Sequence, residues 1–367
     1  MGEGEATKTR PDPEVQIQVS TVCVFKIDDT GRFRSSSHGF GNSGTDDWGK
    51  ATCLISISVY ERGDIFFFYR PKVGREEAHS ADDVQRFYIV LRPESGERPV
   101  EVKQSPESGK EGAMKEGGDG EGGSTAKKSA KPTEEGHEGG HGVQRVEIQK
   151  EPLHRFMVMG KKRLPDPGKR SRPYWGFVEM VTTNTDDIKT ALKGDEYDTS
   201  TRGHRRVPPA RALAEGVYRI LRHRRSRGGK AHTHLVYKLE LPPAGESNEP
   251  QESLHVEREG SFVLQIKNPE QSGAAAQFQG VRSKRKAVFP AHLQGQLGQL
   301  RFAPADPPDF LNYEGCEFLL ISASDDIDGE LGLDVKTEQC SDPSCSDLIR
   351  SFGETASVRP LLSGTWD

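Results

Sequence analysis

Basic side chains are concentrated between Lys161 and Lys230. This stretch holds 18 Lys and Arg residues against 8 Asp and Glu residues, so its balance is +10 in a chain whose formal net charge is −5. Arginine forks pair well with phosphate and carboxylate, and a basic face that also carries aromatic rings is typical of nucleic-acid binding. The alternative is a solvated surface that balances acidic segments elsewhere. The residues expected to bind an anion are Arg202, Arg205, Arg206, Arg222, Arg224, Arg225, Arg227 and Lys230.

Three histidines near the end of this stretch have a spacing that could hold a transition metal. His232 and His234 lie two residues apart on an expected strand and so share one face, while His223 ends the partner strand. Imidazole nitrogens are common metal ligands. However, Arg224 and Lys230 would repel a cation, and no nearby Cys or carboxylate completes a known spacing. The sequence therefore favours a polar hairpin end, and these histidines are weak candidates for a metal site.

Two glycine patterns resemble phosphate-binding loops, but their surroundings do not fit. Residues 39–44 match G-x-G-x-x-G, yet a strand and not a helix is expected after them. Residues 44–50 approach the P-loop pattern, but Ala51 stands where a magnesium-binding hydroxyl is required. No nucleophile or metalloprotease pattern is found. The sequence thus predicts no cofactor and identifies no catalytic residue.

The elements that must position these residues recur along the chain. Four landmarks follow one another in the same order twice: an apolar hairpin, an aromatic-containing strand, a further strand and a short capped helix. Such an ordered repeat predicts an internal duplication. The first copy comprises 63–93, 146–156 and 177–188, and the second comprises 216–242, 254–262 and 318–327.

Alternating apolar residues and frequent turn signals predict a mainly β fold, of the β-rich α+β kind, with short capped helices. The duplication would give two tandem related β-rich units, packed with pseudo-two-fold symmetry. Residues 61–63 are expected to turn one strand into the next. The predicted organisation is a disordered lead at 1–14, a first unit at 15–200, a second unit at 201–335 and an acidic tail at 336–367.

Two insertions are expected within these units. Only 32% of the residues are hydrophobic, and residues 97–142 contribute to this because Gly, Glu, Lys and Ser dominate there. Such a segment cannot bury enough apolar surface to offset its ordering entropy, so we expect residues 104–142 to be disordered and dispensable for folding. The second insertion, at 271–312, is rich in Ala, Gln and Pro, with one or two amphipathic turns near 292–300.

The chain carries no sign of a membrane or secretory protein. Five cysteines in 367 residues do not suggest a disulfide framework, so reduced thiols and an intracellular location, cytoplasmic or nuclear, are expected. The first residues are acidic and lack the apolar segment of a secretory signal. No run approaches 18 apolar residues, so no membrane partner is expected.

These features favour a non-catalytic binding or scaffold protein whose basic second unit engages an anionic partner. Nucleic acid, an acidic protein or a phosphorylated ligand would each qualify. The alternative is an enzyme, metal-dependent in one version, with its site in a cleft between the two units. There, arginines would clamp a phosphate or an oxyanion beside His204, His223, His232 or His234.

Overall fold

The structure is a computed structural model of the chain. It describes residues 21–27, 33–36, 53–94, 101–104, 143–146, 153–169, 171–201, 203–225, 230–243, 248–271, 286–337 and 345–366. The described part is mostly β with short helices, which confirms the predicted fold class. The predicted lead at 1–14 lies outside the described residues, as does most of the insertion at 97–142.

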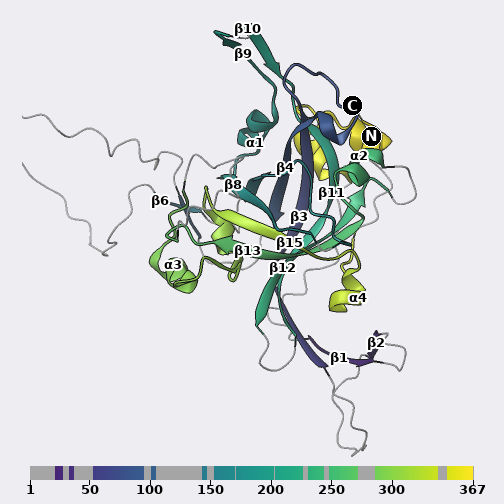
Figure 1. Ribbon diagram of the computed structural model, residues 1–367, viewed down its shortest axis with the longest axis vertical. Coiled ribbons are helices and arrows are strands. Elements are labelled where there is room, and N and C mark those ends of the chain that lie inside the picture. Colours follow the sequence, from purple (N-terminus) through teal and green to yellow (C-terminus); the bar gives the residue numbers. More distant parts are fainter. Residues whose placement is uncertain are drawn as a thin grey trace, which may run out of the picture.

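Eight antiparallel strands of the described part close into a barrel (Figure 1). The first four form a meander: β3 (Cys53–Pro71), β4 (Val84–Pro93), β7 (His154–Met159) and β8 (Tyr174–Thr182). The other four form a second meander: β11 (Arg211–Arg225), β12 (Ala231–Leu241), β13 (Glu259–Lys267) and β15 (Glu317–Ser324). The pairings β3–β11 and β8–β15 join the two meanders and close the barrel.

Smaller elements extend or flank this barrel. β1 (Thr21–Ile27) and β2 (Phe33–Ser36) continue the sheet from β3, and β14 (Phe302–Pro304) pairs with β13. Two separate ribbons are β5 (Glu101–Gln104) with β6 (Val143–Val146), and β9 (Asp195–Thr199) with β10 (Gly203–Val207). The helices are α1 (Thr185–Leu192), α2 (Glu249–Ser253), α3 (Ala291–Leu297), α4 (Ile327–Leu331), α5 (Asp347–Phe352) and α6 (Arg359–Ser363), with 3-10 turns η1 (Ala81–Asp83) and η4 (Pro308–Asn312).

The two meanders occupy corresponding places in the fold. Each has four strands, and each is followed at once by a short helix, α1 or α4. The first strands of the meanders pair with each other, and so do the last strands. This arrangement is what two duplicated units related by a two-fold axis would require. The duplication itself stays a prediction, because corresponding topology can arise without common descent.

The predicted turn at Glu61–Gly63 is wrong, because β3 runs through it as one strand of 19 residues. Glu61 points into the barrel, where its charge is buried. Gly63 is needed for close strand contact: a Cβ there would lie 2.1 Å from the carbonyl oxygen of Arg92. Gly216 makes the same approach in β11, 2.2 Å from the carbonyl oxygen of Lys238. These glycines allow two neighbouring strands to approach closely. In the sequence, a glycine with this role is easily mistaken for a turn residue.

The core has an inner and an outer part because successive strand residues point to opposite faces. Inward-facing residues such as Phe67, Tyr237 and Phe262 fill the barrel, and their rings contact one another at centroid distances of 5.2 and 6.1 Å. Outward-facing residues of β3, β4 and β7 pack beneath α1, α5 and α6. Helix α4 covers the outer face of β11 and β12 through Ile327 and Leu331.

An ion pair lies inside the barrel. The guanidinium of Arg155, which is fully buried, donates to both carboxylate oxygens of Glu61, with Nη2 3.0 Å from Oε2. Its Nε donates to Asn312 Oδ1 at 2.7 Å, and the hydroxyl of Tyr218 donates to Glu61 Oε1 at 2.7 Å. The network therefore ties together β3, β7, β11 and η4, which come from both meanders.

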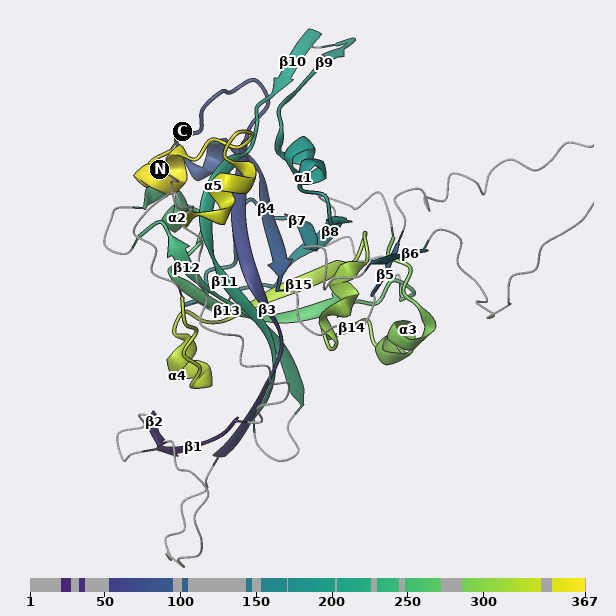
Figure 2. The ribbon, with the colours of Figure 1, turned by 180° about the vertical axis from the view of Figure 1, so that it is seen from behind.

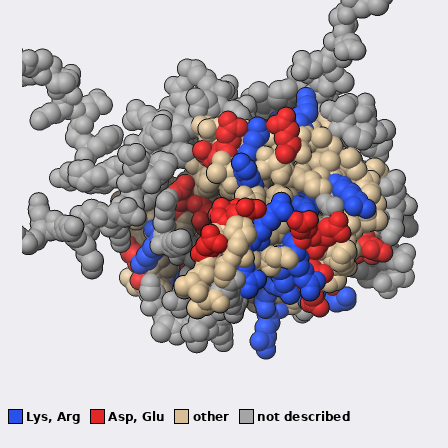
Figure 3. Space-filling model, turned by 90° about the horizontal axis from the view of Figure 1, so that it is seen from above, with Lys and Arg blue, Asp and Glu red and all other residues tan. Residues whose placement is uncertain are grey.

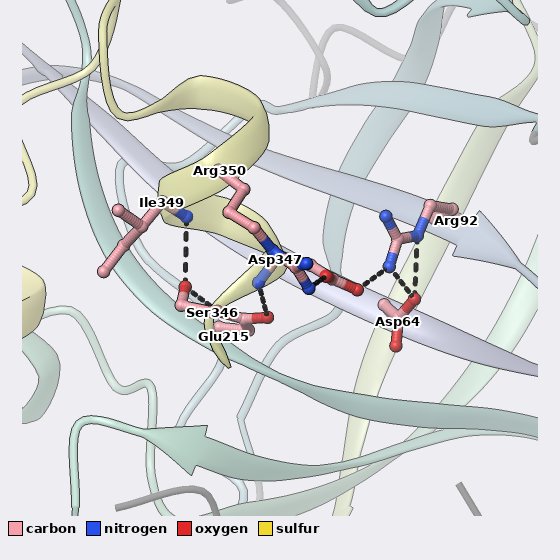
Figure 4. Close-up of polar contacts among 7 residues, drawn as sticks. All are labelled: Asp64, Arg92, Glu215, Ser346, Asp347, Ile349 and Arg350. Atoms are coloured by element: carbon pink, nitrogen blue, oxygen red, sulfur yellow. Dashed lines mark hydrogen bonds and ion pairs between the residues drawn. The ribbon is translucent and has the colours of Figure 1, made fainter. Parts of the chain in front are cut away.

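The C-terminal segment, which comprises residues 345–366 of the predicted acidic tail, is fastened to the barrel. Ser346 caps α5 and donates through its hydroxyl to the buried carboxylate of Glu215, which also accepts from the Asp347 amide at 3.0 Å (Figure 4). The side chain of Asp347 pairs with Arg92, which is held in turn by Asp64 at 2.6 Å. Asp347 thus serves as an anchor of this segment. Its buried apolar residues are Leu348, Phe352, Ala356 and Leu361.

The second predicted insertion also contributes to the core in its described part. α3 buries Leu293 and Leu297, in agreement with the amphipathic turns expected near 292–300, and η4 buries Phe310 and Leu311. The first insertion starts from β4 and returns to β7 within one meander, with the β5–β6 ribbon between them. Its low-complexity residues, 105–142, lie outside the described part of the chain.

The structure bears on the expectations for the cysteines and for membrane-spanning helices. Cys316 is free and fully buried, and burial raises the pKa of its thiol. Cys345, however, is disulfide-bonded, so the expectation of reduced thiols is wrong for that residue. Among the described residues, no helix has the length and apolar character to cross a membrane.

We predict that breaking the internal ion pair on one side destabilises the protein strongly. Glu61→Gln leaves the buried guanidinium without its counter-charge, so the free energy of unfolding should fall by about 3–5 kcal/mol in chemical denaturation. The double variant Glu61→Leu, Arg155→Met removes both charges and should be less destabilised than Glu61→Gln. A single variant that unfolds at the wild-type denaturant concentration would contradict the role given to this pair.

Candidate functional site

The predicted anion-binding residues do not form one patch. Arg205 and Arg206 lie on β10, at the end from which the β9–β10 hairpin projects, whereas Arg222 and Arg224 lie near the far end of β11 (Figures 1 and 2). At about 3.3 Å per residue, β11 separates the two groups by roughly 40 Å. Arg225 ends β11, Lys230 is exposed just before β12, and Arg202 and Arg227 lie outside the described residues.

Basic residues at the far end of β11 are partly committed to internal contacts. Arg222 Nη1 lies 3.4 Å from the Tyr60 hydroxyl and 3.5 Å from Asp306 Oδ2. The hydrogen bond to Tyr60 is the main cause that raises the pKa of Arg222. Only Arg224 and Lys230 are exposed cations with described side chains at this end. This end therefore offers less free positive charge than the sequence suggested.

The candidate histidines do not form a common catalytic or metal site. His223 and His234 are buried with their rings 5.3 Å apart, and His234 Nδ1 lies 3.0 Å from Ser261 Oγ. His232 is exposed, and His204 lies on β10 at the other end of the barrel. Among the described residues, no group of three or more His, Cys, Asp or Glu is arranged to hold a metal ion. The two meanders meet through the hydrogen-bonded pairs β3–β11 and β8–β15.

The β9–β10 hairpin has two unlike faces. On one face, His204 Nδ1 lies 3.2 Å from Asp198 and its Nε2 lies 3.6 Å from Glu196. Arg206 also belongs to this face and pairs with Glu196 at 3.6 Å and with Glu76 at 2.6 Å. Because residues alternate along a strand, the intervening residues point to the opposite face. On the first face, the positive charge of Arg206 is therefore already paired with carboxylates.

The opposite face of the hairpin forms one wall of an open groove. Tyr197 and Val207 line this wall, and Arg205 is the cross-strand partner of Tyr197. Tyr197 is 41% exposed, which is unusual for so large a ring. The groove has a volume of about 380 Å³, within the range of about 300–1,000 Å³ typical of ligand sites. Its remaining lining residues are Arg70, Val73, Gln85, Arg86, Tyr88, Thr190, Ala191, Lys193 and Asp195.

Arg70 builds the floor of this groove. Its guanidinium donates to the carbonyl oxygens of Ala191 at 2.6 Å, Lys193 at 3.1 Å and Pro208 at 2.6 Å, and to the Tyr88 hydroxyl at 3.0 Å. The last carbonyl groups of a helix lack hydrogen-bond donors within the helix, and Arg70 supplies donors for those at the end of α1. One buried side chain thus fixes α1, the base of the hairpin and Tyr88 relative to one another.

Three further cations surround the groove without counter-charges from the described residues. Arg86 is the cross-strand partner of Arg70, a pairing of like charges that is unfavourable unless something offsets it. Neither Arg86, Lys193 nor Arg205 forms an ion pair with a described residue. Asp195 is the one carboxylate among the lining residues, so positive charge predominates in the groove.

Positive charge continues beyond the groove. The guanidinium of Arg205 lies over Gly74 in the loop after β3, since a Cβ on that glycine would be 3.9 Å from Nη1. In the same region, burial and then the like charge of Lys72 lower the pKa of Lys162. Seen from this end, Figure 3 shows Lys and Arg side chains through the middle of the face, with Asp and Glu side chains beside them. Further cations therefore lie near the groove, among acidic residues.

Comparison with known proteins gives no relative for this chain: no family model, no curated protein and no solved structure matches it. The site must therefore be interpreted from its own geometry.

Sequence reasoning found one member of this site, Arg205, and missed Arg86, Lys193 and Tyr197. Arg86 and Arg70 lie in the first predicted unit, far along the chain from the basic stretch. A usable signal was the presence of Arg70 and Arg86 at matching positions on two strands of one predicted hairpin, because such residues become cross-strand neighbours.

We predict that Arg70→Met loosens the end of α1 and the base of the hairpin. The substitution keeps much of the apolar stem but leaves three carbonyl groups without their donor. Amide hydrogen exchange should become faster at residues 189–195 and 207–210, with little change in β13. Arg86→Met is the matched control, because this neighbouring guanidinium forms no ion pair with a described residue and its removal should leave exchange unchanged. If amide hydrogen exchange at these residues is the same in Arg70→Met and Arg86→Met, Arg70 does not position the end of α1 and the hairpin base.

Proposed function

We propose that the protein is a non-catalytic binding protein that engages a phosphate-bearing or otherwise polyanionic partner at the hairpin end of the barrel. The observation that carries the proposal is an open groove lined by Arg86 and Lys193, with Arg205 across from Tyr197 on its hairpin wall; none of these three cations forms an ion pair with a described residue. Lys193 is exposed and Arg86 and Arg205 are half-buried, and accessible cations that are left unpaired and held on rigid elements attract anions at low cost. The basic stretch recognised in the sequence supports this function through Lys193, Arg205 and Lys162.

Rigid placement distinguishes this surface from scattered surface charge. Arg86 lies on a barrel strand, Lys193 follows α1, and Arg205 lies on the hairpin. Arg70 holds these three elements together through its carbonyl bonds. Fixed cations lose less conformational entropy when an anion binds than cations on loose loops. The arrangement thus favours a binding surface over a merely solvated one.

An enzymatic function is not supported by the arrangement of the candidate histidines. His204 is paired with carboxylates on the outer face of the hairpin, and His223 and His234 lie beneath α4 near the opposite end. His234 lies beside the Ser261 hydroxyl, but His204 lies on β10 at the other end of the barrel, so the candidate histidines do not come together at one site. We therefore propose binding alone.

We expect a triple variant, Arg86→Ser, Lys193→Ser and Arg205→Ser, to bind polyanions more weakly than the wild type. Each phosphate that a cation neutralises releases counterions, so the slope of log affinity against log salt should become shallower by about one unit for each cation removed from the interface. The measurement is a salt titration of binding to single-stranded RNA, duplex DNA and heparin. The fold should survive, because exposed charges contribute little to stability.

The matched control removes three cations from the other end of β11: Arg222→Ser, Arg224→Ser and Lys230→Ser. This variant has the same net charge as the groove triple, so only the position of the removed charge differs. It should bind nearly as well as the wild type. Weaker binding in the control alone would move the site to the far end, and a wild type that binds none of the probes at low salt would end the proposal.

A further inference from the structure

We propose that the partner of the groove is a single-stranded nucleic acid, with a base stacked on Tyr197. This inference rests on the proposed function and narrows it from polyanions in general to one class of polymer. Three observations carry it: the position of an exposed aromatic ring, the two-faced charge of the hairpin, and the extent of the basic surface beyond the groove.

The first observation is the ring of Tyr197. It is the one large exposed aromatic side chain among the described residues, and it lines the groove opposite α1. The other tyrosine of the groove, Tyr88, is buried and stacks on Phe156 with ring centroids 5.0 Å apart. Tyr88 therefore belongs to the core, whereas the face of Tyr197 is open to a ligand. An exposed ring beside cations is the arrangement on which unpaired bases stack.

The second observation is the division of charge on the hairpin. Glu196, Asp198, His204 and Arg206 satisfy one another on one face. Arg205 lies directly across from Tyr197 on the other face and has no ion pair with a described residue. A cation next to an aromatic ring matches a nucleotide, because the phosphate and the base can be contacted together. This face of the hairpin thus presents an aromatic ring, Tyr197, and a neighbouring cation, Arg205, which could contact the base and the phosphate of one nucleotide.

The third observation concerns length. Cations extend from Arg86 and Lys193 in the groove to Arg205, and Lys72 and Lys162 add charge on the same end of the molecule. A small phosphorylated ligand in the groove would leave the outer cations unused, whereas a strand could contact both regions. A duplex fits less well, because its bases stack on each other and cannot reach an isolated ring. The combination favours a single strand.

The test compares Tyr197→Ala with Tyr197→Phe, using short oligouridine and oligothymidine, a duplex of the same length, and heparin. Stacking contributes enough per base that Tyr197→Ala should weaken single-strand binding roughly ten-fold. Tyr197→Phe keeps the ring and should bind like the wild type. Heparin has no bases, so its binding should be the same in all three proteins. Val59→Ala, which removes another exposed apolar side chain at the far end of β3, is the control for a general surface effect.

A direct readout accompanies the affinities. An oligonucleotide that carries 5-bromouracil should cross-link under ultraviolet light to Tyr197, and peptide mapping should locate the adduct there. If heparin binds but single strands bind no better than the duplex, or if Tyr197→Ala binds oligouridine like the wild type, this inference is overturned while the polyanion function stands. If heparin and every oligonucleotide fail to bind at low salt, the proposed function fails with it.

Discussion

Two opposite charges sealed inside the barrel are the interaction on which the rest of the structure depends. Arg155 and Glu61 are almost completely buried, and taking such ions out of water is costly unless each finds its partner. Their pairing requires β7 to face β3 across the barrel, while Tyr218 fixes β11 and Asn312 fixes η4 at the same place. A slip of one residue in β3 would turn Glu61 outward and leave Arg155 without a counter-charge. The pair therefore specifies register in a barrel whose interior is filled mainly by apolar side chains.

The basic groove lies on the outside of this barrel and depends on the interior only through the backbone. Outward-facing residues of β3 and β4 supply Arg70 and Arg86, while inward-facing residues of the same strands form the core. Arg70 then connects the barrel to α1 and to the base of the hairpin. This division lets the surface charges change with little cost to the packing inside. The C-terminal segment is held differently, because the barrel residues that anchor it, Glu215 and Asp64, are buried carboxylates with a structural role.

The sequence predicts the local secondary-structure elements of this protein better than it predicts the long-range contacts between them. Alternating apolar residues located most barrel strands, and the helices at 185–192 and 327–331 were expected where α1 and α4 lie. The cap of α1 is Asn184, whose side chain accepts from the Asp186 amide. By contrast, Glu61 and Gly63 resembled a turn in the sequence. Glu61 pairs with Arg155 and Gly63 makes room for the Arg92 carbonyl, and both partners are distant in the sequence. The basic stretch looked continuous for a related reason. The sequence pattern of β11 does not show that the length of this strand holds the basic residues at its two ends far apart.

The pairing β8–β15 has a consequence for the order in which the chain is made. β3 and β11 can pair as soon as the ribosome has released residues up to about 225, which joins the two meanders along one seam. β8 is synthesised before β11, yet its partner β15 begins only at Glu317. Through that interval β8 has an unpaired edge with apolar residues, the kind of edge on which nascent chains aggregate. The second seam is thus closed late during translation, and α1, which follows β8 immediately, is in place to pack on the half-barrel before that happens.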